Sequence, residues 1–392
     1  MKSIILGIIL TFNTLVLLSQ TRYDVKLKLD GFNREFIVVV PSKAPPSGGY
    51  PIVIMLHGTS GDGEKFYNIS GWKELGQEEN FITVFPSSLR WCWIEDGIEN
   101  HNTRWVNGNV TDHPCSGPPQ IYVDDVKFLK TIVQLLRDTL PVNKKKVYAS
   151  GFSNGSSMTH KLAIEAGDIF SAVAGSSAPL AMGDSAMPIK RIPEWYMVGT
   201  LDDRHIVPPF TELPFGRDTI LNYLGAVLHR AKVCQGVTDN FIFYGDDSSH
   251  VYVFNESIVG GISSSPYIFS LNKGQLHEFP NGTNYPLNAP KLFWEFFKQS
   301  SLLSTQSIEK DKPVIEVFPN PSNNIIHLNI KNLNQHNAYH INVINALGQI
   351  VYQTSQIVQS TIDLDLNNLG KGLFIIKVET GNQFVSKQVL IY

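Results

Sequence analysis

The chain has 392 residues, which at about 150 residues per domain is enough for two to three domains. Its formal net charge of −3 argues against nucleic-acid binding, because proteins that neutralise phosphates usually carry a net basic surface. Hydrophobic residues make up 43% of the chain and charged residues 17%, so the sequence can form a packed core and is unlike a disordered chain.

The N-terminus predicts an export signal. Lys2 precedes an apolar stretch, Ile4–Leu18, and polar residues follow at positions 19–21. The stretch is shorter than the roughly 20 apolar residues of a membrane-spanning helix, and this order of segments is typical of a secretory signal peptide. An uncleaved membrane anchor is the alternative. We assign residues 1–20 to a signal peptide and expect a secreted protein with no stable membrane span.

Residues 21–303 alternate predicted strands with predicted helices, beginning with a hairpin around Asp30-Gly31. The predicted strands are Tyr23–Leu29, Arg34–Val40, Ile52–Leu56, Ile82–Phe85, Val147–Ser150, Ala172–Gly175, Trp195–Val198, Phe241–Tyr244 and Tyr267–Leu271. The predicted helices are Val123–Leu140, Ser156–Ala166, Ile220–Ala231 and Lys291–Phe297. This alternation predicts an α/β domain with a mainly parallel sheet covered by helices.

The composition changes after Ser300. Residues 304–312 are polar and predict a linker. Residues 313–392 contain only alternating strand-like segments separated by turn residues, namely Ile325–Ile330, His340–Ile344, Gln349–Gln353, Ile362–Leu366, Leu373–Glu379 and Val385–Ile391. This pattern predicts a small C-terminal β-sandwich.

Three cysteines are too few for a scaffold built on disulfides, and they lack the spacing of a structural zinc site. Cys92 and Cys115 bracket a polar, aromatic-rich segment, and in an exported protein a disulfide between them would tie its ends together. Cys234 is left over. The alternative is that all three are buried thiols. The histidines are scattered, so we expect no metal site and no cofactor.

The sharpest motif is Gly151-Phe152-Ser153-Asn154-Gly155, between a predicted strand and a predicted helix. A serine at such a turn is exposed as a nucleophile, and the start of the helix offers free N–H groups to a developing oxyanion. Side chains at the two glycine positions would collide in so tight a bend. A Ser/Gly turn without chemistry is the alternative, and we predict that Ser153 is the nucleophile.

A serine nucleophile needs a base, which an acid in turn orients. We predict that Asp202 is this acid, because it follows the predicted strand Trp195–Val198 at the sheet edge where open α/β sheets bind ligands. Asp203 is the alternative acid. His277 lies in a loop between a late strand and the last helix, which is the place expected for the base. The other downstream histidines fit less well. His205 is too close to the acid in the chain, His229 lies in a predicted helix, and His250 lies at what resembles a hairpin tip.

A tetrahedral intermediate needs two hydrogen-bond donors for its oxyanion. The Asn154 N–H, directly after the nucleophile, is one candidate. We predict the Thr59 N–H as the other, because glycines on either side let the loop after Ile52–Leu56 approach a substrate closely. His57 precedes the nucleophile in the chain and is expected to orient this loop.

Five motifs occur in the order found in one known family: Leu56-His57-Gly58, Val123-Asp124-Asp125-Val126, Gly151-Phe152-Ser153-Asn154-Gly155, Gly199-Thr200-Leu201-Asp202 and His277. Residues 22–300 thus resemble the α/β-hydrolase family of polyhydroxybutyrate depolymerases and feruloyl esterases. The resemblance implies a triad of Ser153, Asp202 and His277, an oxyanion hole of Thr59 and Asn154, and structural capping by Asp124 and Asp125. The chain departs from the family at Thr59, at Ser156-Ser157 and at Gln275-Leu276.

The resemblance implies a secreted serine carboxylesterase acting on feruloyl or acetyl esters of plant cell-wall polysaccharides. Polyhydroxyalkanoates are the alternative substrate, and a non-catalytic surface-binding protein is the alternative function. Trp91, Trp93 and Trp105 could stack on a phenolic acid or a sugar ring, or could pack a small core of their own.

The C-terminal segment carries a second series of motifs: Phe318-Pro319-Asn320-Pro321, Asn345-Ala346-Leu347-Gly348-Gln349, Leu369-Gly370-Lys371-Gly372-Leu373-Phe374 and Lys387-Gln388-Val389-Leu390-Ile391. About residues 315–392 resemble the sorting domain of proteins exported by the type IX secretion system. The resemblance implies that the export machinery is a partner of this chain. A carbohydrate-binding or adhesive sandwich is the alternative.

Overall fold

The computed structural model describes residues 20–391, except 96, 112, 182–185, 189, 259–263, 305–313, 321, 323–324, 332–337, 346–348, 358–360 and 381–382. The predicted signal peptide lies outside the described residues except for Gln20, and the predicted linker lies outside them except for Ser304, which ends the last helix of the first unit. The chain divides into two compact units, Met1–Ser304 and Thr305–Tyr392. No described helix combines the length and apolar character needed to cross a bilayer.

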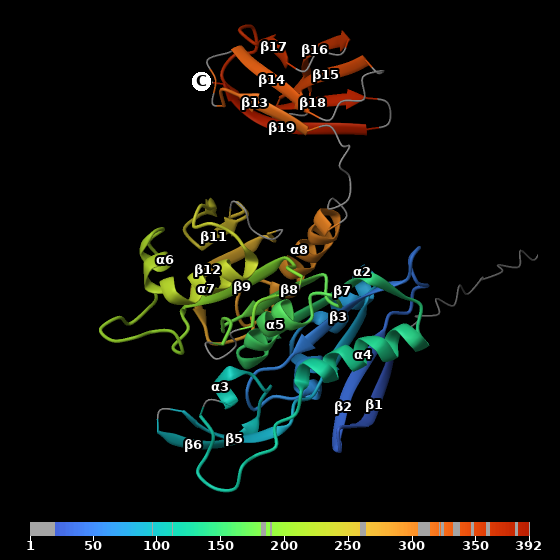
Figure 1. Ribbon diagram of the computed structural model, residues 1–392, viewed down its shortest axis with the longest axis vertical. Coiled ribbons are helices and arrows are strands. Elements are labelled where there is room, and N and C mark those ends of the chain that lie inside the picture. The colour runs from blue at the N-terminus through green and yellow to red at the C-terminus, as the bar shows by residue number, and fades with distance from the viewer. Residues whose placement is uncertain are drawn as a thin grey trace, which may run out of the picture. The chain divides into compact units, whose positions relative to one another are not determined.

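The first unit is built on a ten-stranded sheet with the strand order β1-β2-β4-β3-β7-β8-β9-β12-β11-β10 (Figure 1). Its middle strands, from β4 to β12, are parallel, whereas the pairs at both ends are antiparallel. The strands are β1 (Thr21–Leu29), β2 (Phe32–Val40), β3 (Tyr50–Leu56), β4 (Ile82–Pro86), β7 (Val142–Phe152), β8 (Ala172–Ser176), β9 (Glu194–Leu201), β10 (Ile242–Gly245), β11 (Ser249–Phe254) and β12 (Tyr267–Leu276). The expected mainly parallel α/β sheet is confirmed.

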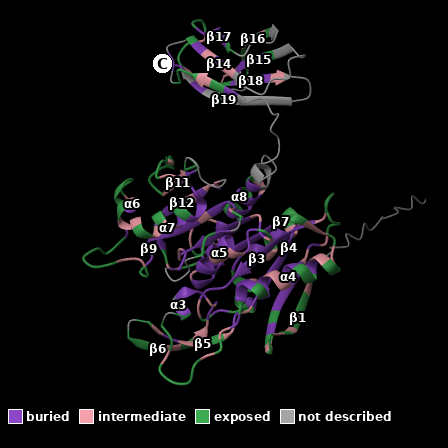
Figure 2. Ribbon diagram, viewed as in Figure 1, coloured by how far each residue is buried: buried purple, intermediate pink, exposed green. Residues whose placement is uncertain are grey.

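Helices cover both faces of the sheet, as the burial of β3 requires. Every residue of β3 is buried (Figure 2). Ile52, Ile54 and Leu56 pack on one face with α4 and α5, and the alternate residues Val53 and Met55 pack on the other with α1, α2 and α8. The helices are α1 (Gly63–Ile69), α2 (Trp72–Glu79), α4 (Asp125–Thr139), α5 (Asn154–Glu165), α6 (Thr219–Tyr223), α7 (Gly225–Gln235) and α8 (Ala289–Ser304).

Several elements differ from the sequence prediction. Helices α1 and α2 and strands β11 and β13 (Val314–Phe318) were not predicted, and the predicted helix Ile220–Ala231 is divided into α6 and α7 at Leu224. The segment after β4 forms a separate hairpin, β5 (Arg90–Glu95) and β6 (Ile98–Thr103), followed by the short helix α3 (Gly108–Thr111). We call residues 90–115 the insertion.

The second unit consists of two small sheets, β13-β14-β17 and β16-β15-β18-β19. Apolar residues of both sheets, such as Ile326 and Leu328 from one and Ile341 and Val343 from the other, form one buried cluster. Two sheets that share a core in this way make the predicted β-sandwich. The remaining strands are β14 (Ile325–Lys331), β15 (Ala338–Ile344), β16 (Ile350–Ile357), β17 (Thr361–Asp365), β18 (Gly372–Thr380) and β19 (Gln383–Ile391).

Candidate active site

Ser153 lies in a sharp turn between the end of β7 and the start of α5. Its backbone has φ 52° and ψ −124°, a strained conformation for a residue with a side chain. A Cβ at Gly151 would lie 2.2 Å from the carbonyl oxygen of Gly155, and a Cβ at Gly155 would lie 2.4 Å from that of Leu56. The turn therefore requires glycine at both positions, and it places the serine hydroxyl at the carboxyl edge of the parallel strands.

His277 lies between Ser153 and Asp202. Its Nε2 is 3.0 Å from Ser153 Oγ, and its Nδ1 is 2.8 Å from Asp202 Oδ1. The aspartate is fully buried, while 21% of the histidine side chain is exposed. The buried carboxylate accepts a hydrogen bond from Nδ1–H, which leaves Nε2 free to accept the serine proton. Residues from the ends of β7, β9 and β12 thus meet as the sequence predicts.

The side chains of the alternative residues Asp203, His205 and His250 do not join the hydrogen-bond chain from Ser153 to Asp202 within the described residues. Asp203 is exposed and lies 4.0 Å from Arg204, and His205 Nε2 lies 3.0 Å from the carbonyl oxygen of Ser177. His250 stacks on Phe215 with ring centroids 3.9 Å apart, and its burial lowers its pKa.

The loop after β3 packs against the nucleophile. A Cβ at Gly58 would lie 3.2 Å from Ser153 Cβ, so only glycine lets the loop approach this closely. The N–H groups of Thr59 and Asn154 donate no hydrogen bond within the part of the chain that the structure describes. Both amides are thus free of described partners, and their role as an oxyanion hole stays a prediction.

The insertion braces this loop and the first residue of α5. Trp105 donates its backbone N–H to Asn154 Oδ1 at 2.6 Å and its indole Nε1–H to the carbonyl oxygen of His57 at 2.9 Å. Thr103 accepts the Ser60 N–H at 3.0 Å through its carbonyl oxygen and donates its hydroxyl to the carbonyl oxygen of Gly61 at 2.6 Å. This bracing could not be predicted from the sequence, because no motif marks pairs of residues more than 40 positions apart.

His57 has the orienting role expected for it. Its Nε2 accepts the Ser88 N–H at 3.0 Å, so its proton is on Nδ1, which donates to the carbonyl oxygen of Gly58 at 2.7 Å. Burial lowers the pKa of His57 to about 4. A neutral imidazole therefore holds the loop in place.

The two acidic residues at the start of α4 have different roles. Asp124 caps the helix by accepting the Lys127 N–H at 2.8 Å, as expected. Asp125 does not cap it. Its carboxylate is buried, pairs with Arg34 at 2.6 Å and accepts the Val106 N–H at 2.8 Å, so it ties β2 and the insertion to α4.

The three tryptophans of the insertion are buried, with relative exposures of 7%, 2% and 0% for Trp91, Trp93 and Trp105, respectively. Trp91 packs on Tyr122, and Trp93 lies under the Arg104 guanidinium. Such burial leaves little of each indole ring exposed for stacking on a substrate. It favours the alternative in which these residues pack a core of their own.

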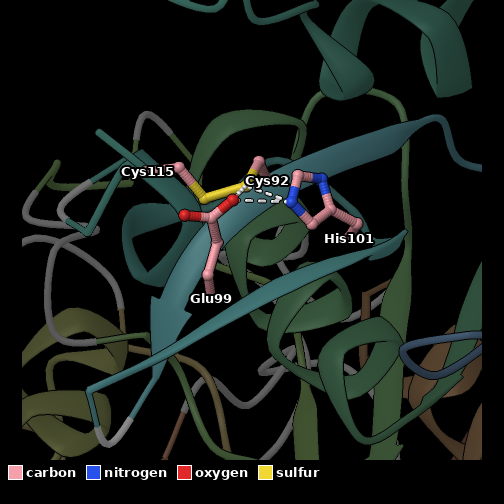
Figure 3. Close-up of side chains that lie close together, drawn as sticks. All are labelled: Cys92, Glu99, His101 and Cys115. Atoms are coloured by element: carbon pink, nitrogen blue, oxygen red, sulfur yellow. Dashed lines mark hydrogen bonds and ion pairs between the residues drawn. A yellow bond between two sulfur atoms is a disulfide. The ribbon is translucent and has the colours of Figure 1, made fainter. Parts of the chain in front are cut away.

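The predicted Cys92–Cys115 disulfide is present (Figure 3). Cys234 is a buried free thiol. Two groups of described side chains have metal-ligating atoms close together. One is Asp202, Asp203 and His277, in which the Asp202–His277 hydrogen bond already occupies the facing atoms. The other surrounds the disulfide and was not predicted.

Residues 31–205 match the family described as putative esterase, and residues 316–392 match the secretion system C-terminal sorting domain. The sorting-domain match confirms the predicted type IX tail and a secreted or cell-surface location.

The bifunctional acetylxylan esterase/xylanase XynS20E of Neocallimastix patriciarum is 24% identical over 173 residues, which is 44% of this chain and 22% of that protein. Feruloyl esterase B of Thermothelomyces thermophilus is 26% identical over 164 residues, which is 40% of this chain and 49% of that protein. The chain thus spans at most about half the length of these curated relatives. An acetyl xylan esterase structure from Aspergillus awamori aligns with 71% of this chain and 99% of its own, at 16% identity and a TM-score of 0.45. Residues 31–205 of this chain are thus similar to the esterase family, and residues 316–392 to the secretion system C-terminal sorting domain.

Proposed function

We propose that the protein is a secreted serine carboxylic ester hydrolase that acts through an acyl-enzyme. The observation that carries this proposal is the continuous hydrogen-bond chain from Ser153 Oγ through His277 to the buried Asp202 carboxylate. Such a chain activates a hydroxyl that is otherwise a poor nucleophile at neutral pH.

The reaction has two halves. In the first, Ser153 Oγ attacks the ester carbonyl carbon while His277 Nε2 takes the hydroxyl proton, and the Thr59 and Asn154 N–H groups donate to the oxyanion. The intermediate collapses as His277 gives its proton to the departing alcohol, which leaves an acyl-serine. In the second, His277 takes a proton from water, the resulting nucleophile attacks the acyl-serine, and the carboxylic acid leaves as Ser153 regains its proton. Asp202 keeps the imidazole oriented throughout.

Feruloyl or acetyl esters of plant cell-wall polysaccharides are the proposed substrates. The names of the two relatives, an acetylxylan esterase/xylanase and a feruloyl esterase, support this choice. Release of ferulate from methyl ferulate, acetate from acetylated xylan and hydroxybutyrate from polyhydroxybutyrate should be compared at equal enzyme concentration. Faster cleavage of the polyester than of both other substrates would replace this choice with a polyhydroxyalkanoate depolymerase.

The Ser153→Ala variant tests the catalytic proposal. Hydrolysis of p-nitrophenyl acetate should fall by about 10⁴- to 10⁶-fold in kcat, because the nucleophile is lost while the rest of the site remains. Ser157→Ala is the matched control, since Ser157 is a buried serine on the same helix that donates to the carbonyl oxygen of Pro179. Equal rates for wild type and Ser153→Ala would favour a non-catalytic binding protein.

We further propose that the type IX export machinery recognises the C-terminal unit. The match of residues 316–392 to the sorting domain supports this partner. Fusion of residues 313–392 to a periplasmic reporter should move the reporter to the cell surface in a host with this system. Retention in the periplasm would contradict the proposal.

A further inference from the structure

The Cys92–Cys115 disulfide lies within a group of four potential metal ligands (Figure 3). Cys92 is on β5, directly opposite His101 on β6, and Glu99 is two residues before His101 and so on the same face of the hairpin. Cys115 follows α3 and completes the group. One ligand atom from each of the four side chains lies within 4.8 Å of all the others.

The separations of the Glu99 and His101 ligand atoms from Cys92 Sγ are close to those in a tetrahedral zinc site. His101 Nε2 is 3.2 Å and Glu99 Oε1 is 3.5 Å from Cys92 Sγ, and they are 2.7 Å from each other. Bond lengths of about 2.0–2.3 Å to Zn²⁺ place tetrahedral ligands about 3.3–3.8 Å apart. The hydrogen-bonded Glu99–His101 pair and the covalently bonded sulfur pair both lie inside this spacing, so both must open before an ion can bind.

We propose that Cys92, Glu99, His101 and Cys115 bind one Zn²⁺ ion when the disulfide between the two cysteines is reduced. Two thiolates and an imidazole are ligands that favour zinc over calcium or magnesium, which prefer oxygen. The side chains of Glu99 and His101 are 52% and 60% exposed, so an ion can reach them from solvent. Neither side chain is needed to fill a core.

The conversion needs a thiol or phosphine reductant. The reductant supplies two electrons, which with two protons give two thiols. A thiol reductant is itself oxidised to a disulfide, and a phosphine takes an oxygen atom from water to become a phosphine oxide. Each thiol then loses its proton on binding Zn²⁺. His101 must present a Nε2 lone pair to the ion, so its proton moves to Nδ1, and Glu99 exchanges its hydrogen bond to His101 for a bond to the metal.

A bound zinc ion would link Cys92 to Cys115 as the disulfide does, and would thus join the same two ends of the insertion. The two cysteines are 23 positions apart, and the segment between them contains Thr103 and Trp105, which brace the loop of the proposed oxyanion hole. Either closure holds that segment in place. This consequence rests on the proposed function, whereas the binding of zinc does not.

The test uses the full chain with Cys234→Ser as background, which removes the third thiol. After reduction with tris(2-carboxyethyl)phosphine without oxygen, the protein is titrated with Co²⁺, and the bound Co²⁺ is then displaced by Zn²⁺. We expect one Co²⁺ per chain, with thiolate charge-transfer and tetrahedral d–d absorption bands. The oxidised protein should show neither band.

Three variants in this background identify the ligands. His101→Ala and Glu99→Gln should each weaken Co²⁺ binding by tenfold or more, and both keep the cysteines, so the melting temperature of their oxidised forms checks the fold. His113→Ala is the matched control, because His113 is an exposed histidine of the insertion outside the group and should bind Co²⁺ like the background.

Two results would overturn the proposal. One is a reduced chain that shows no thiolate-to-cobalt band, and the other is a band that His101→Ala leaves unchanged. Ser153→Ala should bind Co²⁺ normally, which separates a failure of the metal proposal from a failure of the proposed esterase activity.

Discussion

Asp202 and Asp203 are adjacent, but among the described contacts only Asp202 is hydrogen-bonded to the imidazole. Asp202 is buried and accepts the hydrogen bond from His277, while Asp203 is exposed. Asp202→Asn should lower kcat for p-nitrophenyl acetate by about 10³- to 10⁴-fold, because the imidazole then loses the acceptor that fixes its tautomer. Asp203→Asn should keep kcat within about twofold, since the exposed Asp203 carboxylate lies near His277 but accepts no hydrogen bond from it among the described residues. Similar losses in both variants would contradict the assignment.

His57 should make the first unit sensitive to acid. Its pKa is lowered to about 4 by burial, below the unfolded value of about 6.5, so below pH 6.5 the unfolded state binds more protons than the folded state. This contribution to stability is complete above about pH 6.5 and is lost as the pH falls toward 4. Between pH 7 and pH 5 it amounts to about 2 kcal/mol in the free energy of unfolding.

Urea unfolding followed by tryptophan fluorescence measures this effect, since all six tryptophans lie in the first unit. His57→Gln keeps an acceptor for the Ser88 N–H but cannot titrate. Its loss of stability from pH 7 to pH 5 should be smaller than that of the wild type by about 2 kcal/mol. An identical pH dependence would show that His57 does not titrate on unfolding.

At the scale of elements, the turn from β7 to α5 leaves no space for a side chain at Gly155. A Cβ at Gly155 would lie 2.4 Å and 2.5 Å from the carbonyl oxygens of Leu56 and His57, so Gly155→Ala must push β3 away from α5. We expect kcat to fall by about 100-fold or more, since a shift of about 1 Å in a catalytic group has this effect.

Gly225→Ala is the control for that change. Gly225 begins α7, and a Cβ there meets nothing within 4 Å, so alanine should stabilise the helix by up to about 1 kcal/mol and leave kcat unchanged. Steady-state kinetics and thermal unfolding of the two variants make the comparison. Full activity in Gly155→Ala would show that the turn can relax.

The sequence predicted those parts of the site that a strand end or a local motif marks. Ser153 is framed by its glycines, and Asp202 and His277 follow strands whose carboxyl ends share one edge. The bracing by Trp105, the Arg34–Asp125 pair and the ligand group around Cys92 were missed. Each of these joins residues from segments that are far apart in the sequence and share no motif, so their contact is seen only in the folded chain. Helices α1 and α2 were missed because they are short, with only seven and eight residues.

At the scale of the whole molecule, every residue of the proposed active site lies in the first unit, and the second unit has its own core. A chain ending at Ser304 should therefore keep kcat/KM for p-nitrophenyl acetate within about twofold of the full-length value, as expected for independent domains. Loss of activity in a truncated chain that still unfolds cooperatively would show that the second unit contributes to the site.

Strand β19 is the last element that the structure describes. Strand β19 is at the edge of its sheet and pairs with β18, and its residues Val389 and Ile391 are buried in the sandwich core. A free peptide copying these last residues would lack the neighbouring strands that give them their shape. If the export machinery recognises this unit, as proposed above, we expect it to contact the folded sandwich, and deletion of β19 should abolish export because Val389 and Ile391 would be lost from the core.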